Sequence, residues 1–263
     1  MVKSGWTLRG VKGWPGIPGA RWGESAIELL PDTAKAGNRF VRMIALTDGT
    51  SEGTMQAQLC QARKYFEGTY AARIRFSDKA AYGSSRDQLV MSFYTSSPYV
   101  KDFDPNYSEL DFEYLPAGGW GANGAAMFNT SWETFQSEPW DARNQSDHVV
   151  GSLEGWHTLV MQVSGGKVNY YVDGKKFAEH GGKNYPRLAM SFNFNLWFIK
   201  DGISADKNPR VWHEDIDWVL HVKDQVLTPA EVESQVAELQ KSGTTLTDTV
   251  PAMNPPLPCP CNF

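Results

Sequence analysis

The chain has 263 residues, enough for one large β-domain or two modest domains, and its 41% hydrophobic content can supply a substantial core. A net charge of −5 without any run of Lys and Arg argues against a nucleic-acid partner, and no stretch reaches the roughly 18 apolar residues that span a bilayer. Aromatic residues make up 13% of the chain, more than a packed core requires, so we expect some rings to line a groove.

Residues 1–23 form an N-terminal extension in which Trp6, Trp14 and Trp22 follow no pattern that we can assign. The first ten residues lack the apolar core of a signal peptide. We expect a soluble, secreted protein whose leader has been removed.

Between residues 25 and 222, short β-type segments alternate with Gly, Pro, Asn and Asp, and none of them has helical periodicity. Two of these segments flank Ser164-Gly-Gly166, where glycines can adopt the positive φ of a tight turn, which predicts a hairpin. Strands at this spacing favour a sandwich or a barrel. The expected strands include residues 39–46, 69–76, 88–94, 156–163 and 167–172.

A single helix is predicted after the strands. Thr228 and Glu231 have the spacing of a capping box, and Pro229 suits the first helical position. Apolar residues then recur at helical spacing until Gly243, and their narrow stripe predicts a helix on the surface of the sandwich. We therefore divide the chain into an extension (1–23), a β-domain (24–223), a helical segment (224–243) and a tail (244–263).

The tail is rich in Pro and Thr and lacks periodicity, which predicts an extended segment. It carries Cys259 and Cys261, and the only other cysteine is Cys60. Three cysteines do not make a disulfide framework, and Cys-Pro-Cys is not a metal-binding spacing that we recognise.

Residues 107–115 carry the most informative pattern. Apolar and acidic residues alternate strictly, so one face of an extended strand belongs to the core and the other carries Glu109, Asp111 and Glu113. Like charges on neighbouring positions of one face repel each other, so stability alone does not explain the pattern.

Glycoside hydrolysis would explain these carboxylates, because a retaining glycosidase needs a nucleophilic carboxylate and a protonated carboxylic acid about 5–5.5 Å apart. Glu109 and Glu113 lie about 13 Å apart at their Cα atoms, and long side chains leaning together on a concave sheet close most of that gap. Asp111 can help to hold one Glu ionised and the other protonated. A solvated acidic face and a calcium-binding edge remain alternatives.

Glu109-Leu-Asp-Phe-Glu113 resembles the E-x-D-x-E signature of glycoside hydrolase family 16, the lichenases, laminarinases and xyloglucan-modifying enzymes. The resemblance extends over residues 24–223 and implies an all-β, concanavalin A-like jelly-roll sandwich of two antiparallel sheets, to which this chain adds its C-terminal surface helix. Further segments similar to family landmarks follow in the expected order, at residues 66–75, 155–158, 170–174, 194–197 and 215–219.

By this resemblance Glu109 is the nucleophile, Asp111 the assisting acid and Glu113 the general acid/base of a double displacement that retains configuration. The single residue between Asp111 and Glu113 is similar to the regular strand of lichenases, whereas laminarinases commonly have a bulge. The resemblance thus implies an endo-acting β-glucanase on β-1,3- or mixed-linkage β-1,3-1,4-glucan. It implies no cofactor for the chemistry, and we expect a monomer whose partner is the polysaccharide.

Five residues are candidates for binding the substrate. The glycine-rich loop after the acidic strand can bring Trp120 over the carboxylates, where its ring could stack on a sugar. The resemblance adds Asn129 and Trp132, and alternation along a later strand adds Asn195 and Trp197. A place in the core or on a strand surface is the alternative for each of them.

Asp217 matches a position that ligates a structural calcium in some relatives, and an uncommitted surface Asp is the alternative. His157 and His213 are expected to be strand histidines, because the carboxylates already fill both chemical roles.

Three functions besides hydrolysis stay open. A carbohydrate-binding lectin could keep the jelly roll without turnover, although it would need no proton donor beside a nucleophile. A transglycosylase uses the same residues and differs only in the acceptor. The fold could also serve unrelated chemistry, since fold does not fix function.

Overall fold

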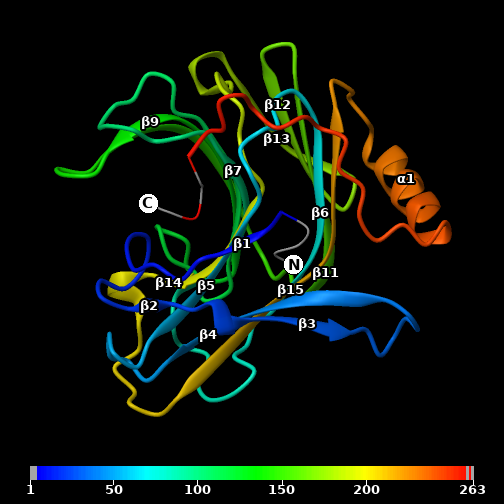
Figure 1. Ribbon diagram of the computed structural model, residues 1–263. Helices are drawn as coiled ribbons and strands as arrows, with labels where there is room; N and C mark the ends of the chain where they lie inside the picture. Colours follow the sequence, from blue (N-terminus) through cyan, green and yellow to red (C-terminus); the bar gives the residue numbers. More distant parts are fainter. Residues whose placement is uncertain (1–4, 259–260, 262–263) are drawn as a thin grey trace.

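The computed structural model describes residues 5–258 and 261, and strands dominate it (Figure 1). The strands expected from the sequence are present with small changes at their ends. The elements are β1 (Thr7–Leu8), β2 (Arg21–Trp22), β3 (Ile27–Pro31), β4 (Arg39–Thr47), β5 (Met55–Cys60), β6 (Gly68–Phe76), β7 (Leu89–Ser96), β8 (Glu109–Leu115), β9 (Ala126–Gln136), β10 (Asp141–Val150), β11 (Gly155–Ser164), β12 (Lys167–Val172), β13 (Lys175–Gly181), β14 (Asn193–Phe198), β15 (Arg210–Lys223) and α1 (Pro229–Lys241).

The strands form two antiparallel layers, as expected. One layer has the order β10-β9-β8-β7-β14-β5 and the other has the order β4-β15-β6-β11-β12-β13. The two are joined where β4 meets β5 through a single ladder pair, Leu46 with Met55. Figure 1 shows the layers curving around a shared interior, with α1 outside the second layer. Strand β8 therefore lies inside the first layer, between β7 and β9.

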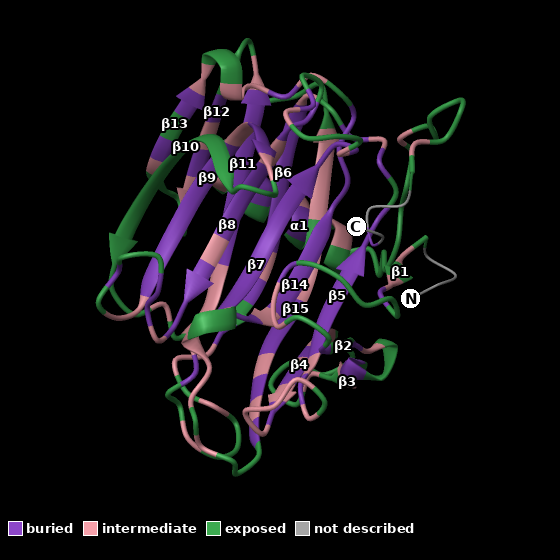
Figure 2. Cartoon of the chain, turned by 90° about the vertical axis from the view of Figure 1, so that its left-hand side faces the viewer, coloured by how far each residue is buried: buried purple, intermediate pink, exposed green. Residues whose placement is uncertain are grey.

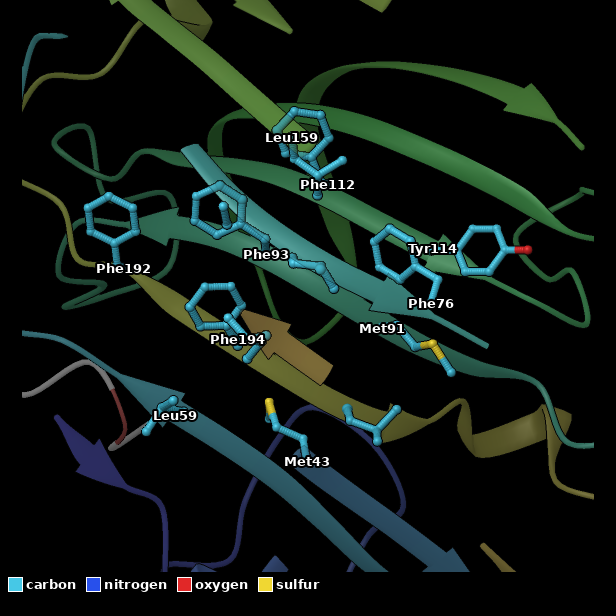
Figure 3. Close-up of a cluster of buried hydrophobic side chains, with 14 of the residues drawn as sticks. Met43, Leu59, Phe76, Met91, Phe93, Phe112, Tyr114, Leu159, Phe192 and Phe194 are labelled. Carbon is cyan, nitrogen blue, oxygen red and sulfur yellow. The ribbon is translucent and has the colours of Figure 1, made fainter. Parts of the chain in front are cut away.

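The core lies between the two layers and is rich in aromatic rings (Figure 3). Phe93 on β7 stacks on Phe112 of β8 and on Phe194 of β14, with ring centroids 6.1 and 5.2 Å apart. All eight residues of β7 are buried. Figure 2 shows this burial along β7 and β14, whereas the edge strand β10 is exposed throughout. Close packing of the core side chains thus fixes the position of the central strands. The face of β8 that points away from the core is held in place with them.

Helix α1 begins as the sequence predicts. Thr228 and Glu231 form a reciprocal capping box, and Pro229 is the first helical residue. Val232 and Val236 are buried, whereas most of the other residues of α1 are exposed, so it is a surface helix. No helix among the described residues is long and apolar enough to cross a bilayer.

The structure corrects one expectation about the cysteines. Cys60 on β5 and Cys261 in the tail form a disulfide with their Cα atoms 5.8 Å apart, although 201 residues separate them in sequence. Both half-cystines are buried beside β1, which pairs with β5 through Thr7 and Cys60. The bond therefore joins the tail to the strand that holds the N-terminal extension. Cys259 lies outside the described residues.

Candidate active site

The three carboxylates predicted to share a face do so. Strand β8 pairs with β7 and β9 without any register shift, so its alternation is unbroken. Its apolar residues are fully buried in the core, whereas Glu109, Asp111 and Glu113 all line one cleft on the other face. The expectation of a regular, unbulged strand is also met.

The cleft is formed by three neighbouring strands and by part of the N-terminal extension. Glu113 on β8 lies opposite Ser92 on β7, and Ser92 lies opposite Asn195 on β14, so these side chains form one row across the layer. The residues that line the cleft are Trp14, Pro15, Ser92, Tyr94, Glu109, Asp111, Glu113, Asn195 and Trp197.

Glu109 and Glu113 have different electrostatic surroundings. Burial raises the pKa of Glu109 to about 7, while a hydrogen bond from the Tyr107 hydroxyl at 2.6 Å and the positive charge of Arg63 both oppose the rise. Burial, with a contribution from the negative charge of Glu109, raises the pKa of Glu113 to about 8. The Tyr107 hydrogen bond and the charge of Arg63 thus favour the ionised form of Glu109, whereas the charge of Glu109 favours the protonated form of Glu113.

Asp111 lies between them and is 2% exposed. Burial raises its pKa well above the ordinary range, and the charges of Glu109 and Glu113 add to the effect. A hydrogen bond from the indole N–H of Trp132, 2.7 Å from Oδ2 of Asp111, acts in the opposite direction. The cluster can thus contain an ionised carboxylate next to a protonated carboxylic acid. Acid and base chemistry on a single bond requires both forms.

The N-terminal extension forms one wall of this cleft. The buried guanidinium of Arg9 donates hydrogen bonds to the carbonyl of Trp14 at 3.0 Å and to Oε1 of Gln58 at 2.7 Å. Gln58 in turn donates to the hydroxyl of Tyr94, which lines the cleft. These contacts fix Trp14 and Pro15 beside the carboxylates. Sequence reasoning missed this role, because no local pattern links residues 9–15 to β5.

Aromatic rings gather at both ends of the carboxylate row. At the Glu109 end, Trp14 lies 5.9 Å from Phe135 and 6.4 Å from Trp140, measured between ring centroids, and Trp132 adjoins the same group. At the Glu113 end, Trp120 and Trp197 lie 6.2 Å apart. Flat apolar rings beside carboxylates are what a sugar chain needs, because sugar rings have an apolar face and a polar rim.

Comparisons with solved structures identify the fold. A family 16 endo-glucanase from Bacteroides ovatus superposes with a TM-score of 0.64 at 14% identity, covering 84% of this chain and 95% of its own. A β-glucanase from Bacillus licheniformis superposes with a TM-score of 0.56 at 15% identity, covering 83% and 92%, and a laminarinase from Flavobacterium sp. UMI-01 with 0.56 at 11%, covering 84% and 94%.

The chain has the fold of the family 16 glycoside hydrolases. No family model and no curated protein matches the sequence itself.

Within this family 16 fold, four of the five predicted substrate-binding residues lie at the cleft or beside it. Asn195 and Trp197 line it, Trp132 reaches Asp111 from β9, and Trp120 adjoins Trp197 with 46% of its surface exposed. Asn129 is the exception, because it lies opposite Phe112 on the core side of the layer and is fully buried.

The histidines lie where they were expected, outside the cleft. His157 on β11 pairs with Asp173 at 2.6 Å, and His213 lies on β15 opposite Ile44. Both strands belong to the second layer. Neither residue lines the cleft.

The surroundings of Asp217 do not fit a calcium ion. Its Oδ1 accepts a hydrogen bond from the amide of Asn38 at 2.9 Å, and its Oδ2 faces the guanidinium of Arg73 at 3.7 Å. Calcium requires several oxygen ligands, whereas these two neighbours present N–H donors. No group of three or more His, Cys, Asp and Glu among the described residues has the geometry of a metal site.

Proposed function

We propose that this chain is a retaining endo-β-glucanase acting on β-1,3- or mixed-linkage β-1,3-1,4-glucan. The observation that carries the proposal is the row of Glu109, Asp111 and Glu113 on one face of β8, in a cleft with aromatic groups at both ends. The solved proteins of similar fold include some named β-glucanase, lichenase and laminarinase, which favours a β-glucan as the substrate.

In the proposed mechanism, ionised Glu109 attacks the anomeric carbon while protonated Glu113 donates its proton to the departing glycosidic oxygen. A covalent glycosyl-enzyme forms. Glu113, now ionised, then takes a proton from water, and the resulting attack at the anomeric carbon releases Glu109. Two inversions restore the original configuration. These two roles match the surroundings of the glutamates, because Tyr107 and Arg63 favour ionised Glu109 while the charge of Glu109 favours protonated Glu113.

Asp111 is assigned an assisting role. Its raised pKa and its place between the two glutamates let it share a proton with them as the charge moves from Glu109 to Glu113. Trp132 fixes the orientation of its carboxyl group. Trp197 and Asn195 are proposed to contact the sugar from β14.

The test is release of reducing sugar from barley β-glucan, laminarin, xyloglucan and agarose by the wild type and by Glu109→Gln. We expect cleavage of barley β-glucan or laminarin with an early fall in viscosity, and a loss of at least about 10³-fold in the variant. The matched control is Glu133→Gln, a carboxylate on β9 that does not line the cleft and should change the rate less than about twofold.

Product analysis separates the alternatives. NMR of the first product should show the β-anomer, because the configuration is retained. Transfer of the glycosyl group to added oligosaccharide in preference to water would identify a transglycosylase. Binding of glucans by the wild type without cleavage would favour a lectin, and activity that survives in Glu109→Gln would contradict the assignment of the nucleophile.

A further inference from the structure

A second hollow, of about 310 Å³, lies on the outer face of the layer opposite the cleft. Its floor is formed by β15, β6 and β11, and its walls are α1 and the turn between β3 and β4. Figure 1 shows α1 on the far side of the molecule from β9. We propose that this hollow is a second, non-catalytic binding site for a neutral sugar residue of a glucan chain.

A β-bulge builds the floor of the hollow. The pairing of β15 with β6 shifts register between Ile216 and Trp218, so Asp217 is the extra residue. Consecutive residues of a regular strand point to opposite faces, yet Asp217 and Trp218 both line the hollow. Bulges commonly redirect a side chain toward a functional site. This one directs a carboxylate and an indole ring into the same space.

Two tryptophans supply apolar surface together with hydrogen-bond donors. Trp156 on β11 and Trp218 on β15 both line the hollow, and the guanidinium of Arg73 lies 5.6 Å from the ring centroid of Trp156. Neither indole N–H donates a hydrogen bond to any residue of the described chain. An indole offers a flat ring for the apolar face of a sugar and one donor for a hydroxyl group.

The charged side chains that line the hollow are three carboxylates, Asp32, Asp217 and Glu233, and two cations, Lys35 and Arg73, and each already has a partner, which favours a neutral ligand. Asp32 accepts a hydrogen bond from the amide of Asn38, and Glu233 accepts one from the hydroxyl of Thr158. Asp217 accepts from Asn38 and faces Arg73, whose side chain is 39% exposed. Lys35 donates to the amide oxygen of Gln240 at 2.7 Å, which ties the wall of the β3–β4 turn to α1. Because each of these charges already has a partner, the site offers a ligand mainly ring faces and hydrogen-bonding groups. That combination suits a polyol ring.

The identity of the ligand as a glucan rests on the proposed function, but the site can be tested separately. The indole N–H signals of Trp156, Trp218 and Trp197 are assigned in NMR spectra from single Trp→Phe variants, and cellotetraose and laminaritetraose are then titrated into Glu109→Gln. We expect the Trp156 and Trp218 signals to shift with millimolar affinity, independently of the Trp197 signal in the cleft. If the Trp156 and Trp218 signals shift while the Trp197 signal does not, the result supports sugar binding at the second hollow. The same result contradicts the proposed binding of glucan in the cleft.

The consequence for the polymer is tested with Trp156→Ala and Asp217→Asn. Each should weaken retention on insoluble β-glucan by about tenfold, as the loss of one stacking or hydrogen-bonding contact does. The rate on soluble tetrasaccharide should stay within about twofold of the wild type. The control is Tyr82→Ala, an exposed ring that lines neither hollow and should change neither quantity. Unshifted Trp156 and Trp218 signals at saturation of the cleft, or unchanged retention in folded variants, would overturn the proposal.

Discussion

Trp132 donates its indole N–H to Oδ2 of Asp111 at 2.7 Å, across the pairing of β9 with β8. The bond favours the ionised carboxylate, so it opposes the burial that raises the pKa of Asp111. In Trp132→Phe a ring remains but the donor is lost. We expect kcat to fall about tenfold and the pH optimum to move upward, because the acidic cluster then holds its protons to higher pH.

The pH profile of kcat/KM gives the measurement for Trp132→Phe. Trp140→Phe is the control, since Trp140 lies 6.1 Å from Trp132 between ring centroids and donates to none of the three carboxylates. An unchanged optimum in Trp132→Phe, with the rate loss alone, would assign Trp132 a packing role only.

The two glutamates predict a bell-shaped pH dependence. The rate requires Glu109 ionised and Glu113 protonated, so it should rise as pH passes about 7 and fall as pH passes about 8. The two limbs belong to the coupled cluster as a whole. A dinitrophenyl glycoside tests the alkaline limb, because its leaving group needs no proton. On the dinitrophenyl glycoside, Glu113→Gln should keep appreciable activity. The fall in rate at alkaline pH should be absent from this variant. A maximum below about pH 5 in the wild type would contradict this assignment.

Because the N-terminal extension forms one wall of the cleft, we expect a substitution of Trp14 to weaken binding of the polysaccharide. Trp14 lines the cleft with 54% of its surface exposed, and its carbonyl is fixed by Arg9. Trp14→Ala removes the ring and leaves that hydrogen bond in place. We expect KM for the polysaccharide to rise about tenfold while kcat changes less than about threefold, because the ring does not touch the transferred proton. A fall in kcat at unchanged KM would show that Trp14 acts on the chemical step instead.

Local patterns predicted most of this fold, and contacts between distant segments explain what they missed. The alternation along β8 is a property of neighbouring residues, so the face shared by Glu109 and Glu113 followed from the sequence. Asn129 was misassigned because the pairing register of β9 with β8, which puts it opposite Phe112, decides its face. The Cys60–Cys261 bond gave no local signal at all, since its partners lie 201 residues apart.

Glu214 on β15 is a buried carboxyl group that the proposed mechanism does not use. It is fully buried, and neither of its carboxyl oxygens has a hydrogen-bond partner. Burial raises its pKa well above the ordinary value of 4.5, and the charge of Asp215 adds to the rise. The folded protein therefore keeps this group protonated at pH values where the unfolded chain has released the proton.

The sign of the resulting pH dependence follows from this shift. Below about pH 4.5, Glu214 is protonated in both the folded and the unfolded chain, so its full contribution to the unfolding free energy is present. As the pH rises from there toward the folded-state pKa, the unfolding free energy falls by at most about 1.4 kcal/mol per pH unit. Glu214→Leu removes this loss and replaces the carboxyl group with a side chain of similar size. We expect the variant to exceed the wild type in unfolding free energy by more than about 2 kcal/mol near pH 8, and by less near pH 4.

Urea unfolding at both pH values measures the difference. Glu214→Gln is the control, because it removes the titration but leaves a polar group without a partner, so its gain should be smaller at both pH values. Equal stability of wild type and Glu214→Leu near pH 8 would mean that the carboxyl group is solvated or paired in solution. A gain that is the same at both pH values would instead assign the effect to packing against the neighbouring core, where Met43 lies opposite Glu214.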